Sequence, residues 1–394
     1  MSSSVFSNRS VFCDEFESIG QLSDLTGVTG VLVVGGAGSI GKYVVHKLIE
    51  IGCGVICVVD RDENELVELV RSVRSRKNLE TDFSTICLDV TSTRLIDFCL
   101  ENSNRFSHVL NLSAMKHVRS ERDKYSCLEM LSVNLLGIIN LMEACRAGGI
   151  ENLFSVSTDK AADPINLMGA SKRAMEMLMG SADDINTHSA RFANVAYSNG
   201  SLLHGFLRRL EVGDPLSCPA DITRYFISGN DAARICCISS FLGRKNTILI
   251  PSKSADIQPI KLIDICISLL RDRGLEPVFF RDPDEAKEFN VTNLQKREIT
   301  HWPVYTFDSD TAGEKKIEVF TAEGEEATVF SRNLMSVEMS QRGAKLSEVR
   351  VREELAALNY SVKRISKKDV LTWVKSLVPT FEFEDVSGSL DDKM

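Results

Sequence analysis

The stretch VLVVGGAGSIG, residues 31–41, is a run of four apolar residues that opens directly into a glycine-rich turn. Glycines stand at positions 35, 38 and 41, and the amphipathic segment YVVHKLIEIG follows at residues 43–52. A glycine turn between a strand and a helix lets backbone amides approach a pyrophosphate at the helix N-terminus, where the helix dipole favours negative charge. Asp60 ends the next apolar run, where a carboxylate accepts hydrogen bonds from both hydroxyls of an adenosine ribose. The stretch therefore predicts a dinucleotide-binding turn.

A second glycine motif competes with this interpretation. Residues 36–42 also spell GxxxxGK, the beginning of a P-loop, but a P-loop continues with Ser or Thr to hold magnesium and this chain has Tyr43. Nucleotide hydrolysis is therefore disfavoured. The charge of Asp60 would repel a 2′-phosphate, although Arg61 beside it could receive one, so we expect NAD in preference to NADP.

From residue 30 to residue 192 short apolar runs alternate with longer amphipathic segments. Runs of about five residues that are apolar on both faces are typical of a parallel sheet covered by helices on both sides. The pattern predicts a Rossmann-type, doubly wound α/β domain. The runs lie at 31–34, 55–59, 85–88, 108–112, 152–156 and 188–192.

After residue 192 this rhythm ends, which indicates a smaller C-terminal substrate-binding domain. Turn-forming residues cluster at 213–221 and 251–259. We expect short strands between helices, and we expect the helices at 202–212, 231–242, 260–272, 346–358 and 367–377. We expect the chain to divide into an N-terminal extension (1–29), an NAD-binding domain (30–195), a substrate-binding domain interleaved with the sheet (196–330), and a C-terminal extension with an acidic tail (331–394).

Composition excludes several other classes of protein. The chain has 394 residues, of which 43% are hydrophobic, and a formal net charge of −9, which argues against a nucleic-acid partner. No apolar run approaches the roughly 20 residues of a membrane span, and the N-terminus lacks a signal peptide, so we expect a cytoplasmic protein with no membrane partner. The eleven cysteines are scattered without paired spacing, which favours reduced thiols and no metal site.

The most specific segment is SVSTDKAADPINLMGASKR, residues 155–173. It resembles the signature of the UDP-N-acetylglucosamine 4,6-dehydratases, the CapD-like polysaccharide-biosynthesis branch of the extended short-chain dehydrogenase/reductase family. Other segments resemble the same branch, namely GGAGSIG (35–41), SAMKHV (113–118), SVNLLGIINLMEA (132–144), RFANV (191–195), ITRYFI (222–227) and AGEKKIEVF (312–320). The resemblance implies NAD-dependent dehydration of UDP-N-acetylglucosamine to a UDP-4-keto-6-deoxy-N-acetylhexosamine for surface polysaccharide or nonulosonate synthesis.

This chemistry makes definite demands on side chains. Oxidation at C4 makes H5 acidic, water is then eliminated across C5 and C6, and a hydride returns to C6. The site needs an acid for the C6 hydroxyl and a base for H5, and Asp159 and Lys160 stand where both could act, with Thr158 at the C4 oxygen. These roles require both residues to be neutral, which burial favours, and a nearby cation such as Lys172 would lower the pKa of Lys160 further.

One position departs from the wider family. Most members carry Tyr-x-x-x-Lys, in which the tyrosine takes the C4 proton, but this chain has Met168 four residues before Lys172. The two residues share a helix face, so Met168 should still line the site. A thioether cannot exchange a proton, which leaves Asp159, Lys160 or a water bound to Thr158 for that role. The resemblance implies that Lys172 holds the nicotinamide ribose.

The resemblance also implies binding residues. For the cofactor they are Gly35, Gly38, Ser39, Ile40, Gly41, Asp60, Arg61, Asp89, Val90, Ser113, Ala114, Lys116, Asn134 and Lys172. For the sugar nucleotide they are Lys116, His117, Asn194, Ser201, Arg224 and Glu314. Arg224 would neutralise the diphosphate with its forked donor, whereas Asn194, Ser201 and Glu314 could equally be turn or cap residues.

Two other functions stay open at this stage. A UDP-N-acetylhexosamine C4-epimerase would keep the oxidation but needs no acid–base pair at C5 and C6. A noncatalytic NAD-binding regulator would explain Met168. We also expect a homo-oligomer, because the helix expected at 125–147 is apolar on more than one face.

Overall fold

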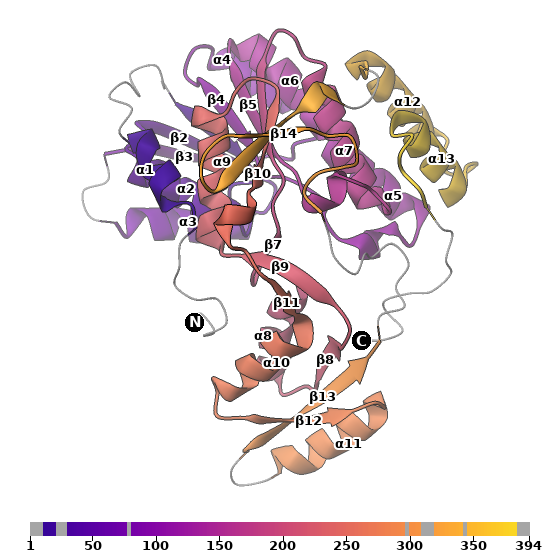
Figure 1. The fold of residues 1–394 in the computed structure, drawn as a ribbon. Coiled ribbons are helices and arrows are strands. Elements are labelled where there is room, and N and C mark those ends of the chain that lie inside the picture. Colours follow the sequence, from indigo (N-terminus) through magenta and orange to yellow (C-terminus); the bar gives the residue numbers. More distant parts are fainter. Residues whose placement is uncertain are drawn as a thin grey trace.

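The computed structural model describes residues 11–20, 30–76, 80–295, 299–308, 319–341 and 345–383. Among these residues a large body surrounds a nine-stranded sheet, and a smaller lobe hangs from one side of it (Figure 1). The strand order of the large sheet is β14-β15-β10-β6-β5-β4-β1-β2-β3. Its strands are β1 (Val31–Val34), β2 (Val55–Asp60), β3 (Asp82–Cys87), β4 (His108–Asn111), β5 (Asn152–Val156), β6 (Asn186–Ala190), β10 (Thr247–Pro251), β14 (Ala327–Val329) and β15 (Leu334–Glu338).

The six strands expected from the apolar runs pair in parallel, with β1 between β2 and β4. All four side chains of β1 are buried, as a strand covered on both faces requires. The prediction of a doubly wound α/β fold is therefore confirmed. The sheet also continues beyond residue 195, because β10 pairs in parallel with β6, and β15 and β14 add antiparallel strands at that edge.

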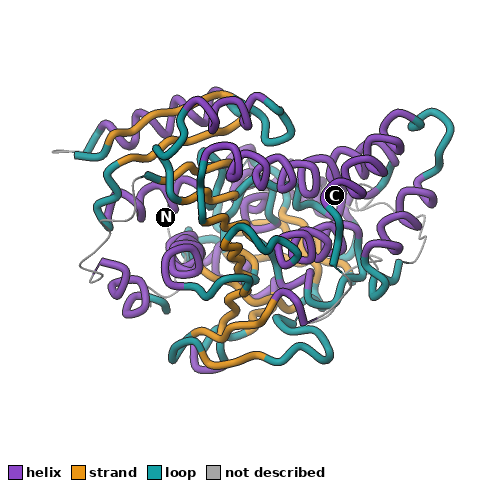
Figure 2. Tube along the Cα trace, turned by 90° about the horizontal axis from the view of Figure 1, so that it is seen from above, coloured by secondary structure: helices purple, strands orange, loops and turns teal. Residues whose placement is uncertain are grey.

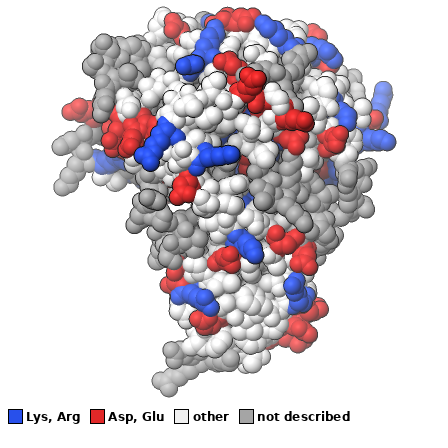
Figure 3. All heavy atoms as spheres, viewed as in Figure 1, with Lys and Arg blue, Asp and Glu red and all other residues white. Residues whose placement is uncertain are grey.

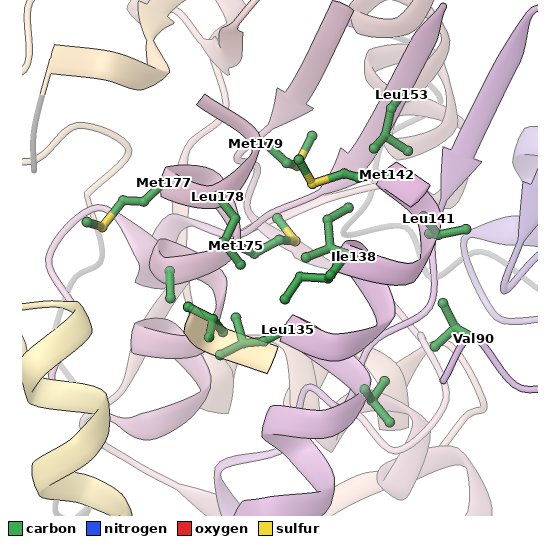
Figure 4. Close-up of a cluster of buried hydrophobic side chains, with 14 of the residues drawn as sticks. Val90, Leu135, Ile138, Leu141, Met142, Leu153, Met175, Met177, Leu178 and Met179 are labelled. Carbon is green, nitrogen blue, oxygen red and sulfur yellow. The ribbon is translucent and has the colours of Figure 1, made fainter. Parts of the chain in front are cut away.

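Helices cover both faces of the sheet, and each layer has its own apolar core (Figures 1 and 2). One layer consists of α1 (Cys13–Gly20), α2 (Gly41–Glu50), α3 (Glu63–Arg74) and α9 (Gly229–Leu242). The other consists of α4 (Arg94–Glu101), α5 (Lys124–Leu131), α6 (Gly137–Gly148), α7 (Leu167–Gly180), α12 (Glu348–Tyr360) and α13 (Lys367–Leu377). Figure 4 shows Met142, Met175 and Met179 among the leucine and isoleucine side chains of this second core.

Helices α5 and α6 form one continuous helix, Lys124–Gly148, interrupted by a π-helical turn at Ser132–Leu136 (η3). Its 25 residues are long and apolar enough to cross a membrane by length and composition, which the sequence analysis did not anticipate. The window that passes this test is 78% buried inside the protein. Helices α7, α12 and α13 pack against this helix, so it is a core helix (Figure 1). The chain's own C-terminal helices thus cover part of the apolar surface that we assigned to a second subunit.

The lobe contains two three-stranded sheets, in the orders β11-β9-β7 and β12-β13-β8. Strand β8 lies inside the segment 213–221, where clustered turn residues pointed to a loop. Its Leu216 and Cys218 are fully buried in the lobe core, which explains a strand at this position. The elements are β7 (Asn194–Val195), α8 (Leu202–Val212), β8 (Leu216–Pro219), β9 (Thr223–Ile227), β11 (Pro259–Lys261), α10 (Leu262–Arg271), β12 (Glu276–Phe280), α11 (Pro283–Leu294) and β13 (His301–Phe307).

The cysteines and the surface charges agree with the composition. All eleven cysteines are free thiols and nine of them are buried, as expected for small apolar side chains. On the described part of the face drawn in Figure 3, Lys and Arg side chains are interspersed with Asp and Glu side chains. The acidic tail that we expected after residue 383 lies outside the described residues.

Candidate active site

The glycine turn after β1 is a tight backbone cradle at the N-terminus of α2. A Cβ atom on Gly41 would lie 2.4 Å from the carbonyl oxygen of Gly35 and 2.5 Å from the Cα of Gly36, so only glycine fits there. Gly35 has a φ of +75° and lies against the amide of Ser113. No side chain caps the start of α2, because Ile40 occupies the N-cap position. The cradle therefore leaves helix amides for an anionic ligand.

Asp60 at the end of β2 turns its carboxylate toward this cradle. One oxygen accepts a hydrogen bond from the amide of Ala37 at 3.0 Å and the other from the amide of Asp62 at 3.1 Å. The largely exposed guanidinium of Arg61 lies 3.8 Å from Asp89. Asp89 accepts hydrogen bonds from the amide and hydroxyl of Thr91. Asp60 thus lies against the glycine turn and Asp89 lies near Arg61, whereas the side chain of Val90 is buried in the core.

Two buried asparagine side chains hold the loop after β4 by hydrogen bonds. Asn111, which sequence reasoning missed, bonds the amide and the hydroxyl of Ser113 and the hydroxyl of Ser155. Asn134 in the π-helical turn accepts from the amide of Met115 and donates to the carbonyl of Met115 and to the hydroxyl of Ser171. Both amide atoms of Asn134 thus already have protein partners, and its expected contact with a cofactor stays a prediction.

Thr158, Asp159 and Lys160 lie just after β5, with Ser157 between the strand and Thr158, and they form one hydrogen-bonded group. The hydroxyl of Thr158 donates to Asp159 at 2.8 Å, and the amine of Lys160 lies 3.2 Å from the same carboxylate oxygen. Asp159 is 3% exposed, and Lys160 opens slightly more to solvent, with 15% of its side chain exposed. The structure therefore brings together the two side chains that we proposed as acid and base.

Lys172 lies on α7, the α-helix that follows this group in the chain. Its amine donates to the backbone carbonyl of Val156 at 2.9 Å, so it reaches the same end of β5. Burial lowers its pKa to about 8, and the negative charge of Glu176 partly opposes this shift. Met168 stands four residues before Lys172 on α7, is 4% exposed and packs into the core.

The first turn of α7 is capped completely by side chains. Glu121, which the sequence analysis did not single out, accepts from the amides of Leu167 and Met168 at 2.9 Å each. Asn166 at the N-cap accepts from the amide of Gly169 at 2.8 Å. Because Glu121 comes from η2 (Val118–Glu121), it ties the loop after β4 to the helix that carries Lys172.

The cofactor cradle and the lobe meet at the loop that follows β7. The hydroxyl of Ser39 in the glycine turn accepts from the amide of Asn199 at 2.8 Å. Lys116 donates to Ser198 at 3.3 Å, and the ring of His117 lies against Gly200. Three of the residues that we expected to touch cofactor or substrate, Ser39, Lys116 and His117, therefore lie at this loop.

The remaining substrate candidates lie on the lobe side. Asn194 donates to the carbonyl of Tyr225, and Ser201 caps α8 by accepting from the amide of His204. Arg224 is 8% exposed on β9 and donates to the carbonyl of Thr223. Glu314 lies outside the described residues. Their contacts with a sugar nucleotide stay predictions.

These residues fit a dinucleotide at the glycine turn. Only glycine fits at position 41, no side chain caps α2, and the carboxylate of Asp60 stands at the position that favours an adenosine ribose. No group of three His, Cys, Asp or Glu side chains that could hold a metal ion occurs among the described residues.

Comparisons with known proteins point in one direction. A family model described as polysaccharide biosynthesis protein matches residues 31–301. The capsular polysaccharide biosynthesis protein CapD of Staphylococcus aureus is 28% identical over 294 residues, which cover 72% of this chain and 47% of CapD. The inverting UDP-N-acetylglucosamine 4,6-dehydratase of Campylobacter jejuni is 24% identical over 276 residues, 67% of this chain and 77% of the relative. The chain thus spans less than half the length of CapD.

Solved structures support the fold. Pen from Bacillus thuringiensis has a TM-score of 0.64 and 18% identity, and the match covers 84% of this chain and 97% of Pen. The UDP-glucose 4-epimerase of Thermus thermophilus, solved with NAD, has a TM-score of 0.55 and 20% identity, and the match covers 74% of this chain and 90% of the epimerase.

Proposed function

The chain belongs to the polysaccharide biosynthesis protein family, whose model matches residues 31–301, and on that basis we propose that it is an NAD-dependent enzyme that dehydrates UDP-N-acetylglucosamine. The product would be a UDP-4-keto-6-deoxy-N-acetylhexosamine for surface polysaccharide or nonulosonate synthesis. The observation that carries the proposal is the buried contact between Asp159 and Lys160 at the end of β5, beside Lys172. Relatives named as dehydratases and as epimerases support the coarser statement that the chain acts on a nucleotide sugar.

The cofactor site would use the chain's own donors and acceptors. NAD, when bound, supplies a reversible oxidation at C4 of the sugar. The amides of the glycine turn and of α2 would hold the pyrophosphate, and Asp60 would accept the hydroxyls of the adenosine ribose. Lys172 would hold the nicotinamide ribose.

The elimination needs an acid and a base, and in this proposal Asp159 and Lys160 fill the two roles. Their side chains lie 3.2 Å apart. Asp159 would then protonate the departing C6 hydroxyl, and Lys160 would remove H5 as the C5–C6 double bond forms. Met168 has no exchangeable proton, so the C4 proton would leave through a water at Thr158.

The mass of the product tests the proposal. Purified protein is incubated with NAD and UDP-N-acetylglucosamine, and we expect a product that has lost one water. An unchanged mass with an inverted C4 would support the epimerase instead. Binding of NAD without any conversion would support a noncatalytic regulator.

A variant pair tests the role of Lys160. Lys160→Ala should abolish the loss of water and leave NAD affinity within about twofold, because the amine acts on the sugar. Lys245→Ala is the control, since this lysine bonds only the surface carbonyl of Asp183 among the contacts described. Wild-type activity in Lys160→Ala would refute the assignment of the base.

We also propose a cytoplasmic location and a homo-oligomer. The free thiols support a reducing compartment. Cell fractionation and sedimentation velocity of the purified protein test these two statements separately.

A further inference from the structure

Four charged side chains next to the candidate site form a closed ionic network. Arg191 makes a two-bond contact with Glu176, at 2.7 and 2.8 Å, and another with Glu325, at 2.6 and 2.9 Å. Arg173 closes the ring, at 3.2 Å from Glu176 and 2.9 Å from Glu325. None of these four side chains is more than 5% exposed. Two cations face two anions, so the buried group is neutral as a whole.

A serine hydroxyl connects this network to the residues at the end of β5. Ser157 donates to Glu176 at 2.6 Å, and Ser157 directly precedes Thr158 in the chain. Glu176 lies four residues after Lys172 on α7, on the same face of that helix. The single carboxylate of Glu176 therefore holds the strand end that leads to Asp159 against the helix that carries Lys172.

Arg191 and Glu325 lie at two of the places where the chain passes between the body and the lobe. Arg191 is the first residue after β6, and β7 in the lobe begins at Asn194. Glu325 lies on the segment by which the chain returns to the body before β14, and Arg191 also bonds the carbonyl of Phe320 in that segment. The network thus ties two of the chain's crossings between the body and the lobe to α7.

Stability alone is a weak reason for such a group. The desolvation of buried ions offsets much of their attraction, and well-packed apolar side chains are often at least as stabilising. Two-bond carboxylate–guanidinium contacts add a fixed geometry, because they restrict the orientation of both partners.

We propose that Ser157 and the network of Arg173, Glu176, Arg191 and Glu325 position Thr158, Asp159 and Lys160 relative to Lys172. Ser157 and Glu176 are positioning residues in this scheme, which act through their neighbours and not on the substrate. The proposal rests on the function proposed above, because it assigns the network to the geometry of that same site. The negative charge of Glu176 also opposes the fall in the pKa of Lys172 that burial causes.

Ser157→Ala tests the link with little risk to folding, because it removes one hydroxyl and leaves all four charges paired. Ser189→Ala is the matched control. Ser189 is an equally buried serine on β6, and its hydroxyl donates to the carbonyl of Ser155 at 2.7 Å without touching the network. Both variants lose one buried hydrogen bond, so a purely structural effect should be similar in the two.

For turnover of UDP-N-acetylglucosamine, we expect Ser157→Ala to lower kcat about 10- to 100-fold with KM and NAD affinity within about twofold. Ser189→Ala should keep kcat within about twofold of wild type. Equal kcat values in the two variants would overturn the proposal. If wild-type protein itself releases no water from the sugar nucleotide, the proposed function fails, and the positioning is decided by the next measurement.

Amide hydrogen exchange gives a readout that needs no activity. In Ser157→Ala the amides of Thr158 to Ala162 should exchange at least about tenfold faster than in wild type, while Ser189→Ala leaves this segment unchanged. Unaltered exchange in Ser157→Ala would show that the hydroxyl does not hold this strand end, and would overturn the proposal whatever the substrate is.

Discussion

Replacing Lys172 with methionine removes an amine that is 4% exposed, and it should change how stability depends on pH. Burial lowers the pKa of this amine from its usual 10.5 to about 8 in the folded protein. Between these two values the unfolded chain binds more protons than the folded chain, so the free energy of unfolding rises with pH. This contribution is complete above about pH 10.5 and is lost as the pH falls through about 8.

The magnitude follows from the two pKa values. Between about pH 7 and about pH 9.5 this one group should raise the free energy of unfolding of the wild-type protein by about 2 kcal/mol. Lys172→Met lacks the contribution. It also loses the hydrogen bond to the carbonyl of Val156, but both protonation states of the amine can donate that bond, so its loss changes little with pH.

Urea unfolding of both proteins at the two pH values gives the required double difference. Other titrating groups cancel, because they are common to wild type and variant. With a slope of about 3 kcal/mol per molar urea, the gap between the two midpoints should change by about 0.7 M. Trp302 in the lobe and Trp373 on α13 allow the unfolding of the two parts to be followed separately.

A gap that stays constant over this pH range would refute the argument. It would mean that Lys172 has a pKa close to its ordinary value, and that its amine is hydrated in solution. A variant of an exposed lysine, Lys345→Met, serves as the control, because the Lys345 side chain is 70% exposed and its removal should add no pH dependence between these values.

Three further changes have defined outcomes. Asp60→Asn should weaken NAD binding about tenfold and raise the affinity for NADP relative to NAD, as measured by titration calorimetry, because a charged acceptor near the ribose is lost; equal NAD affinity in variant and wild type would contradict its role. Glu121→Gln should speed amide exchange in the first turn of α7, whereas Asp123→Asn, which alters the cap of α5, should leave that turn unchanged. Glu325→Gln should lower the free energy of unfolding by about 3 kcal/mol, because two buried guanidiniums then share one carboxylate, while Asp183→Asn in an exposed pair should have no measurable effect.

The regular parts of the fold were predictable because their signal is local. The run at 31–34 coincides with β1, the run at 152–156 with β5, and the expected helices at 202–212 and 367–377 with α8 and α13. Each of these elements buries apolar residues at the spacing of its own secondary structure. That is why a single sequence was enough to place them.

The large sheet beyond β6 was not predictable in the same way. Strand β10 is a fully buried run, TILIP, yet nothing in that run says that it returns from the lobe to pair with β6. Pairing partners that lie about 60 or more residues apart depend on the whole chain. The same reason applies to β15, which pairs with the distant β10.

The candidate site was also predictable only where its signal is local. Thr158, Asp159, Lys160 and Lys172 could be named because they form a local motif and a family resemblance. The groups that hold them could not, because Glu176 has partners 15 residues further along the chain, at Arg191, and 19 residues earlier, at Ser157. Arg191 in turn binds Glu325, 134 residues further along the chain. A charged residue among methionines, as in RAMEMLMG, was the one visible sign of a buried ionic partner.

The π-helical turn at Ser132–Leu136 affects how relatives should be aligned with this chain. Such a turn contains one residue more than an α-helical turn, so the residues after it are rotated by about 100° relative to an uninterrupted helix. An ungapped alignment with a relative that lacks the turn would match every position of α6 to a residue on a different face of the helix. A one-residue gap within Ser132–Leu136 restores the phase. At identities of 24% to 28% that gap decides whether Asn140 is compared with its true counterpart.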